Sequence, residues 1–291
     1  MSMKTYAEGN TVYQQDLIDS NQYSQCISLL RDFFLSKGFK EVPTQSRMSI
    51  LAACEDPSTV QTYNFLGNIW PLPQTGQMWL EYELLNKPQE EGFFCISTSY
   101  REEKNPISGR HKLIFPMFEF ETHGTMEDLK QLEKDLINHL GLNSGNDIKE
   151  LSYNEAANFY KVKEISHKEE NKMVEDFAKN VLLTDFPVYT SPFWNMKLHD
   201  DGIHAKKVDV IIEGNETIGS AERSSNKEEM KHMFYNISDG GYAKLLFDKF
   251  GKERVEQELK DFLAFDFFPR CGGGIGITRM ISALVKNNII K

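Results

Sequence analysis

Apolar residues recur at helical spacing in several stretches of this 291-residue chain. Ile27, Leu30 and Phe34 fall on one side of a helix over residues 23–36, and Gly38 follows as a stop signal. Four further stretches have the same kind of spacing, and the one over residues 167–180 is mostly charged. We therefore predict helices over residues 23–36, 125–140, 167–180, 252–265 and 278–285.

Shorter apolar segments have the composition of β-strands and lie at residues 39–42, 93–98, 113–121 and 208–212. Strands and helices come in blocks rather than in strict alternation. This pattern favours an α+β fold over a doubly wound parallel sheet. No repeat, low-complexity tract or linker divides the sequence, so we expect one domain over residues 1–291.

The composition is that of an ordinary soluble globular protein, with 40% hydrophobic and 26% charged residues. No apolar run reaches the roughly 18 residues that span a bilayer, and the N-terminus does not resemble a signal peptide. Cys26, Cys54, Cys95 and Cys271 lie far apart without CxxC spacing, which argues against a zinc cluster or a disulfide framework. We expect small core cysteines, a cytoplasmic location and no membrane partner.

The net charge bears on nucleic-acid binding. Acidic residues outnumber basic ones by 43 to 33, and the formal net charge is −10. Proteins that hold tRNA usually present a basic surface, because phosphate neutralisation supplies most of the affinity. The charge therefore weakens an interpretation based on tRNA without excluding it.

A first group of polar residues surrounds a predicted hairpin near residues 100–121. An ATP site needs cations for the phosphates, an aromatic face for adenine, and acceptors for its amino group or for metal ions. A surface hairpin with solvated charges would account for any one of these residues as well. The candidates are Arg101, Glu103, Arg110, His111 and Phe115.

A second candidate is the glycine-rich run at residues 272–276, which we expect to form a turn before the last helix. Glycines let a backbone approach a ligand closely, and a helix N-terminus favours anions. Arg279 would lie in the first helical turn. Such runs are often only packing devices, and this one lacks the dinucleotide-binding fingerprint.

A third group consists of Asp209, Glu216 and Arg223, spaced seven residues apart on a predicted strand–turn–strand segment. Two carboxylates so placed could share Mg²⁺ that bridges nucleotide phosphates. An arginine beyond them could pair with a substrate carboxylate. In isolation the same pattern also fits a solvated β-hairpin.

Together and in this order, the three groups resemble motif 2, the acidic strand and motif 3 of class II aminoacyl-tRNA synthetases, and they are most similar to the aspartate/asparagine subgroup. The resemblance covers roughly residues 20–290 and implies an antiparallel sheet flanked by helices. It implies a homodimer and catalytic roles for Arg101 and Arg279. It also implies ATP binding by Arg101, Glu103, Arg110, His111, Phe115, Gly274, Gly276 and Arg279; amino-acid binding by Glu55, Thr75, Gln77, Glu119, Gly219 and Arg223; and Mg²⁺ binding by Asp209 and Glu216.

The chain departs from the subgroup's pattern in several places. The resemblance begins almost at the N-terminus, so we expect no anticodon-binding domain. Motif 3 ends in Ile277-Thr278-Arg279, a run that resembles ammonia-dependent asparagine synthetase. Leu80 stands where aspartate enzymes carry a lysine for the side-chain carboxylate, and Glu222 stands where asparagine enzymes carry a glutamine.

The leading hypothesis is an ATP-dependent, AMP-forming ligase that activates an aspartate- or asparagine-like amino acid without tRNA. Its most concrete form converts aspartate and ammonia to asparagine. One alternative transfers the activated amino acid to tRNA, a carrier protein or a small amine. Another is a regulatory relative that binds a nucleotide or an amino acid without chemistry.

Overall fold

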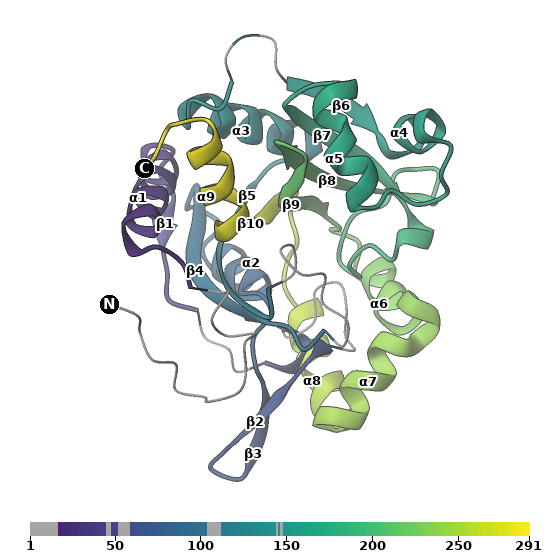
Figure 1. Ribbon diagram of the computed structural model, residues 1–291. Helices are drawn as coiled ribbons and strands as arrows, with labels where there is room; N and C mark the ends of the chain where they lie inside the picture. The colour runs from purple at the N-terminus through teal and green to yellow at the C-terminus, as the bar shows by residue number, and fades with distance from the viewer. Residues whose placement is uncertain (1–16, 45–47, 52–58, 104–111, 144, 146–147) are drawn as a thin grey trace, which may run out of the picture.

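The computed structural model describes residues 17–44, 48–51, 59–103, 112–143, 145 and 148–291 (Figure 1). An eight-stranded sheet forms its centre, with the strand order β1-β4-β5-β10-β9-β8-β7-β6. Pairing is antiparallel except at the two ends, where β1 runs parallel to β4 and β6 parallel to β7. The strands are β1 (Lys40–Glu41), β4 (Gly92–Tyr100), β5 (Ile114–His123), β6 (Ile148–Ser152), β7 (Asn180–Pro187), β8 (His204–Ile212), β9 (Asn215–Arg223) and β10 (Arg270–Gly276).

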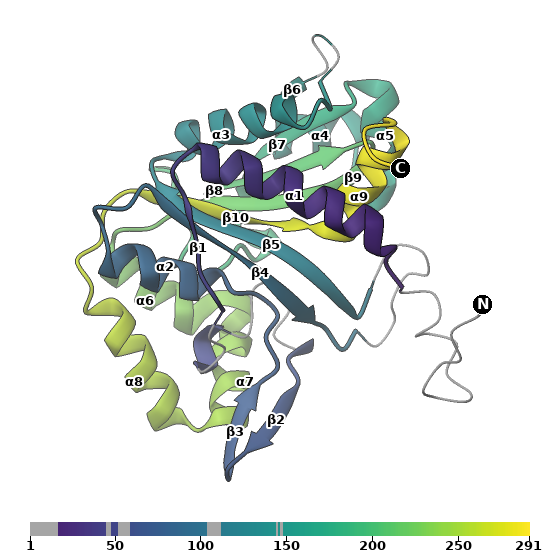
Figure 2. The same cartoon turned by 90° about the vertical axis from the view of Figure 1, so that its left-hand side faces the viewer.

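Helices cover both faces of the sheet (Figure 2). On one face α1, α3 and α9 pack a large apolar core, to which Phe34, Phe118 and Phe120 belong. On the other face α2 and α6–α8 lie over one part, while α4 and α5 cover the β6–β8 end. The helices are α1 (Ser20–Ser36), α2 (Gln77–Asn86), α3 (Met126–His139), α4 (Tyr153–Tyr160), α5 (His167–Asp176), α6 (Lys227–Asn236), α7 (Gly241–Phe250), α8 (Lys252–Leu263) and α9 (Ile277–Lys286), with short 3-10 turns at Ser49–Leu51, Val188–Thr190 and Ile237–Gly240.

The α+β prediction is confirmed, and so are the helices predicted from apolar spacing at α1, α3, α8 and α9. The helix predicted over residues 167–180 is too long. Its α5 counterpart ends at Asp176 because Phe177 leaves helical geometry, with φ −129° and ψ −71°. Asn180 already begins β7, whose apolar side chains alternate between the two faces of the sheet.

The glycine-rich turn predicted at residues 272–276 is wrong. These residues lie in β10, between β5 and β9, where other backbones and side chains approach them closely. A Cβ on Gly273 would lie 2.7 Å from the Gly219 carbonyl oxygen and 2.5 Å from Ser220 Cβ. Glycine therefore permits close packing inside the sheet at this position.

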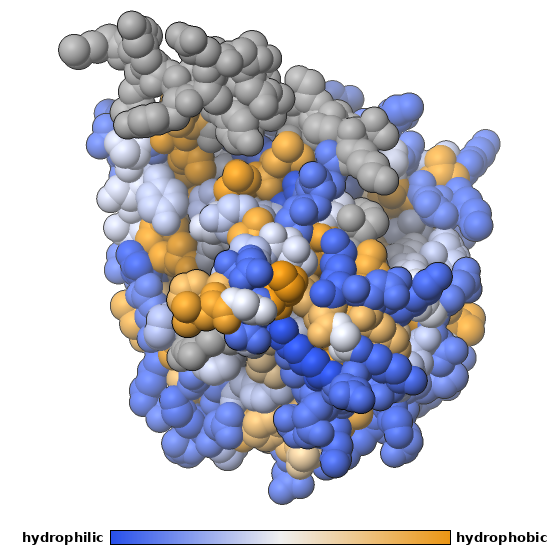
Figure 3. All heavy atoms as spheres, turned by 90° about the horizontal axis from the view of Figure 1, so that it is seen from below, coloured by the Kyte–Doolittle hydropathy of each residue, from blue (hydrophilic) through white to orange (hydrophobic). Residues whose placement is uncertain are grey.

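A separate hairpin of β2 (Thr62–Phe65) and β3 (Asn68–Pro71) projects from the molecule at the end shown in Figure 3. That end carries several apolar patches among polar residues, and the hairpin exposes Phe65 and Leu66. Cys26, Cys95 and Cys271 are buried thiols, as expected, whereas Cys54 lies outside the described residues. In the described part of the chain, no helix combines the length and the apolarity needed to cross a membrane.

Candidate active site

A cavity of about 310 Å³ lies on the sheet face opposite α1, α3 and α9. Its floor is formed by β5, β10, β9 and β8, and α2 contributes to its wall. Residues from all three predicted groups meet here, although they are separated by more than 170 positions in the sequence. Those lining the cavity are Arg101, Glu103, Phe115, Thr75, Gln77, Glu119, Glu216, Gly219, Arg223, Gly274, Gly276 and Arg279.

One end of the cavity combines an aromatic ring with cations. The Arg101 guanidinium carbon lies 5.5 Å from the centre of the Phe115 ring. Across the floor, Arg279 Nη1 donates a hydrogen bond to the Glu216 carbonyl oxygen at 2.5 Å. An aromatic face beside two arginines fits adenine and a polyphosphate. Arg110 and His111, which were predicted to share this end, lie outside the described residues.

The predicted metal-binding carboxylates converge above Gly219 on the floor. A Cβ placed on Gly219 would lie 3.4 Å from Glu216 Oε1 and 3.5 Å from Asp209 Oδ1. Magnesium prefers such hard oxygen ligands and usually takes only one or two carboxylates, with phosphates and water completing its shell. The described residues contain no group of three or more His, Cys, Asp or Glu side chains suited to a metal. The pair thus fits an ion brought in with a nucleotide.

Glu119 is almost fully buried in the wall between β5 and α2. It accepts hydrogen bonds from the Gly76 amide at 2.7 Å and from the hydroxyls of Thr75 and Ser97. Burial raises the pKa of Glu119 above its usual range, while these hydrogen bonds and the nearby Arg101 oppose the rise. The donors fix the carboxyl group in one orientation toward the cavity.

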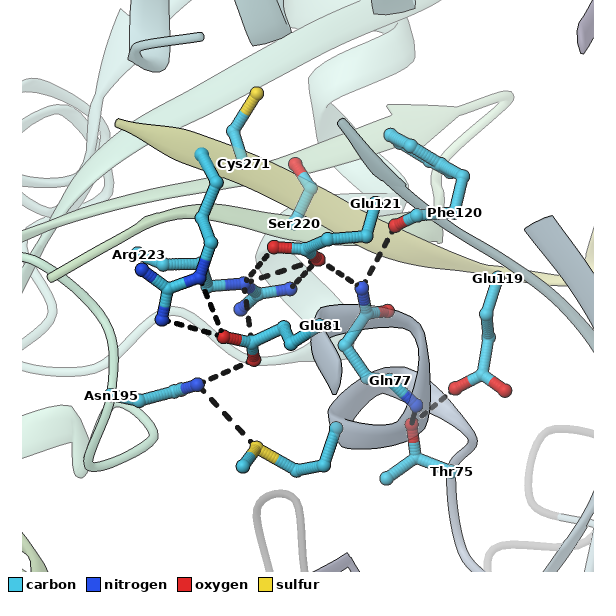
Figure 4. A network of polar contacts seen from close by, with 12 residues as sticks. Thr75, Gln77, Glu81, Glu119, Phe120, Glu121, Asn195, Ser220, Arg223 and Cys271 are labelled. Carbon is cyan, nitrogen blue, oxygen red and sulfur yellow. Dashed lines mark hydrogen bonds and ion pairs between the residues drawn. The ribbon is translucent and has the colours of Figure 1, made fainter. Parts of the chain in front are cut away.

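The deep end of the cavity holds a buried network of charged side chains (Figure 4). Arg223 Nη2 lies 3.2 Å from Glu121 Oε2, and Arg223 Nε lies 3.8 Å from Glu81 Oε1. Gln77 donates its amide hydrogens to Glu121 and, at 2.8 Å, to the Phe120 carbonyl oxygen. Burial raises the pKa of Glu121 to about 7, against the attraction of Arg223 and with the repulsion of Glu81.

The sequence did not identify several members of this network as site residues. Glu81 is held by Arg270 Nη2 at 2.7 Å and by Asn195 Nδ2 at 2.6 Å, and all three side chains are fully buried. Lys207 of β8 also lines the cavity. A single charged residue in an apolar helix or at a strand end is a weak signal, because its importance depends on partners that are distant in the sequence.

Two residues at which the chain departs from the family's pattern, Leu80 and Glu222, do not line the cavity. Leu80 is fully buried in a small core with Leu84, Phe93 and Cys95 and does not line the cavity. Glu222 points to the opposite face of the sheet because neighbouring residues of a strand alternate sides. There it pairs with Lys197 at 2.6 Å and accepts a hydrogen bond from the Met126 amide. Glu222 therefore does not line the cavity, and Glu55 lies outside the described residues.

Comparison with known proteins gives one matching family. The profile of "tRNA synthetases class II (D, K and N)" matches residues 14–291. A search of curated proteins finds no match.

Solved structures of asparaginyl- and aspartyl-tRNA synthetases share the fold. Asparaginyl-tRNA synthetase from Pyrococcus horikoshii, complexed with asparaginyl-adenylate, is 19% identical with a TM-score of 0.74, covering 91% of this chain and 64% of that chain. The Entamoeba histolytica asparaginyl-tRNA synthetase is 19% identical with a TM-score of 0.74, covering 91% of this chain and 63% of that chain. A putative aspartyl-tRNA synthetase from Leishmania major Friedlin is 14% identical with a TM-score of 0.72, covering 91% of this chain and 62% of that chain. The chain thus spans less than two thirds of the length of each of these proteins.

Proposed function

The chain belongs to the class II tRNA synthetases of the D, K and N group, and we propose that it uses ATP to activate an amino acid as its adenylate. The observation that carries the proposal is the arrangement of three arginines around one cavity: Arg101 and Arg279 toward one end and Arg223 at the other. Such a cavity fits a nucleotide and a carboxylate end to end.

Each residue has a separate role that follows from its place along the cavity. Phe115 would stack on adenine, Arg101 would contact the α-phosphate, and Arg279 would hold the outer phosphates. Asp209 and Glu216 would hold Mg²⁺, which neutralises phosphate charge when it is bound. A substrate carboxylate, oriented by Arg223, would then attack the α-phosphorus and release pyrophosphate. Catalysis of this kind rests on positioning and charge neutralisation, so it requires no protein nucleophile.

We further propose that aspartate is the amino acid and ammonia the acceptor, so that asparagine, AMP and pyrophosphate are the products. Two features support this finer form. The formal net charge of −10 disfavours a large phosphate-binding surface. The strand β10 and the start of α9 carry the sequence that resembles ammonia-dependent asparagine synthetase.

A second candidate is aminoacyl transfer to tRNA, a carrier protein or a small amine, favoured by the fold shared with asparaginyl-tRNA synthetases. The third, a non-catalytic binding protein, is disfavoured because Arg101, Glu103, Asp209, Glu216 and Arg279 all remain in the sequence. In every case we propose a homodimer formed through α1 and the segment that follows it.

The decisive experiment incubates the purified protein with Mg-ATP and a panel of amino acids, and follows pyrophosphate and AMP with and without ammonium. Ammonium-dependent AMP release with aspartate, together with asparagine, would establish the finer proposal. Pyrophosphate exchange without ammonium-dependent turnover would leave activation standing and direct the search to tRNA, carrier proteins and amines. The absence of exchange with every amino acid would contradict the proposal.

A further inference from the structure

Arg101 lies where residues 100–102 meet two other segments of the chain. The amide of Tyr100 donates a hydrogen bond to the Pro73 carbonyl oxygen at 2.9 Å. On the other side of Arg101, the Glu102 amide donates to the Thr59 carbonyl oxygen at 3.1 Å. The backbone of Arg101 is therefore held from both sides, and its position depends on where these two segments lie.

The two segments form the base of the β2–β3 hairpin. A hydrogen bond from the Leu72 amide to the Gln61 carbonyl oxygen, at 2.8 Å, extends the hairpin ladder beyond its last strand pair. Continuing the same register places Thr59 opposite Gln74. The base of the hairpin and residues 100–102 are thus joined into one hydrogen-bonded unit beside the cavity.

A buried hydrogen bond between two side chains crosses the base of the hairpin. Gln74 Nε2 donates to Thr59 Oγ1 at 2.6 Å, and only 1% of Gln74 and 3% of Thr59 is exposed. Buried polar groups are costly without partners, so this pair favours the one geometry in which the bond is made. Gln74 also lines the cavity, as Arg101 does. The bond therefore fixes the separation of the two segments at the point where they hold Arg101.

We propose that Gln74 is a positioning residue, whose hydrogen bond to Thr59 sets the place of Arg101 against the α-phosphate of ATP. In this role Gln74 acts through the backbone of residues 100–102 and touches none of the reacting atoms. The inference rests on the proposed function, because that function defines what Arg101 contacts. It assigns a role to a buried side chain of the cavity wall that the sequence did not identify.

The first test measures the backbone beside Arg101 without turnover. Amide hydrogen exchange is followed by mass spectrometry with residue-level fragmentation. Gln74→Met and Thr59→Val remove the bond and nearly keep the size of each side chain. The matched control is Gln257→Met, because Gln257 on α8 makes a hydrogen bond of the same length, 2.6 Å, to Asp261 at an exposed site.

The amides immediately before and after Arg101 should exchange about tenfold faster in Gln74→Met and in Thr59→Val, because local opening becomes easier when the buried bond is lost. Exchange in the central sheet should not change. Gln257→Met should exchange as the wild type does over residues 99–103. Two variants on opposite sides of one bond keep the test available if either of them folds poorly.

The second test asks whether Gln74 acts through Arg101. Misplacing a catalytic group by about 1 Å can cost on the order of 100-fold in rate, so Gln74→Met should lower the kcat of pyrophosphate exchange about 10- to 100-fold. The KM for ATP should change less than about threefold. In an Arg101→Ala background the same substitution should lower kcat by less than about twofold, because the group that it misplaces is already gone. Gln257→Met should keep the wild-type rate.

The outcomes separate this inference from the proposed function. Unchanged amide exchange beside Arg101 in both bond-removing variants would overturn the role of Gln74, whatever the activity. Faster exchange throughout the protein would also overturn it, since the bond would then serve general stability. A rate loss that persists in full in the Arg101→Ala background would show that Gln74 acts on the ligand directly. Local loosening beside Arg101 in a protein that supports no pyrophosphate exchange would support the positioning role and contradict adenylation.

Discussion

Arg223 on β9 and Glu121 on β5 form a buried ion pair across the glycine strand β10, with Arg223 Nη2 3.2 Å from Glu121 Oε2. The two groups can meet because Gly272 of β10 has no side chain between them, since a Cβ on Gly272 would overlap the Glu121 carboxylate. The ionic state of the deep end of the cavity therefore depends on how closely β5, β10 and β9 pack together.

Replacing Arg223 should destabilise the fold in a pH-dependent way. Arg223→Ala leaves Glu121 buried without its cation, and breaking a buried pair in this way costs about 3–5 kcal/mol. Because Arg223 opposes the rise in the pKa of Glu121, its loss should raise that pKa further above 7. Glu121 would then be protonated and neutral at pH 5.5, whereas at pH 8 it would carry a buried charge without its cation. The substitution should therefore lower the unfolding free energy less at pH 5.5 than at pH 8. Urea unfolding at both pH values tests this, and an equal loss at both would contradict it.

Glu133 on α3 should destabilise the protein at neutral pH. Its carboxyl group is buried on the other face of the sheet, where it contacts the Ser220 hydroxyl at 2.6 Å. Burial raises the pKa of Glu133 to about 8, against the lowering effect of Ser220. The folded state thus binds a proton more tightly than the unfolded chain does. Stability is retained below the unfolded pKa of 4.5 and falls as the pH rises toward 8.

Glu133→Gln should therefore stabilise the protein at pH 8 by a few kcal/mol, on the order of 1.4 kcal/mol per unit of pKa shift, and have little effect at pH 4.5. Glu127→Gln on the exposed side of the same helix is the matched control and should change stability by less than about 0.5 kcal/mol. Urea denaturation from pH 4.5 to 8 gives the comparison. A stabilisation that does not grow with pH would contradict the buried, protonated carboxyl group.

Arg101→Ala should slow pyrophosphate exchange about 100- to 1,000-fold, because the α-phosphate would lose a positioned cation in the transition state. The melting temperature should change little, since the guanidinium lies at the cavity rather than in the core. Lys252→Ala, which removes an exposed cation paired with Glu256 on α8, is the control and should keep wild-type exchange. Near-normal exchange by Arg101→Ala would show that Arg101 does not contact the reacting phosphate.

The sequence was most informative where side chains alternate with a clear period. Apolar spacing predicted α1 and α8, and the order of acids and arginines predicted which residues share the cavity. Helix α2 escaped prediction because Met78, Leu80, Glu81, Leu84 and Leu85 are all buried, so no polar face reveals its period. The strand β10 escaped for a related reason, since four glycines carry no alternation of side chains.

The buried charges could not be predicted in the same way. Glu81 and Arg270 are 189 residues apart, and nothing in either local sequence indicates the other. Their pairing depends on α2 packing over β10. Lys206 and Lys207 are equivalent in the sequence, and only the strand register decides which of them enters the cavity.

The glycine strand offers a paired prediction that separates folding from function. Gly273→Ala places a Cβ 2.7 Å from the Gly219 carbonyl oxygen, and a backbone inside a sheet cannot move away without cost. We expect Gly273→Ala to lose about 1–3 kcal/mol of unfolding free energy or more, or to accumulate as insoluble protein. In Gly274→Ala the nearest atom is Met117 Cε at 2.8 Å, the flexible end of a side chain that can turn aside.

Gly274→Ala should therefore fold with nearly wild-type stability, but its methyl group would narrow the cavity floor between Glu119 and Met117. We expect its KM for ATP or for the amino acid to rise at least tenfold, because ligand atoms must approach this backbone closely. Thermal unfolding and pyrophosphate exchange on both variants separate the two effects. A stable Gly274→Ala protein with unchanged KM values would mean that the ligand does not lie against β10, and the arrangement of ATP and amino acid along the cavity would then need revision.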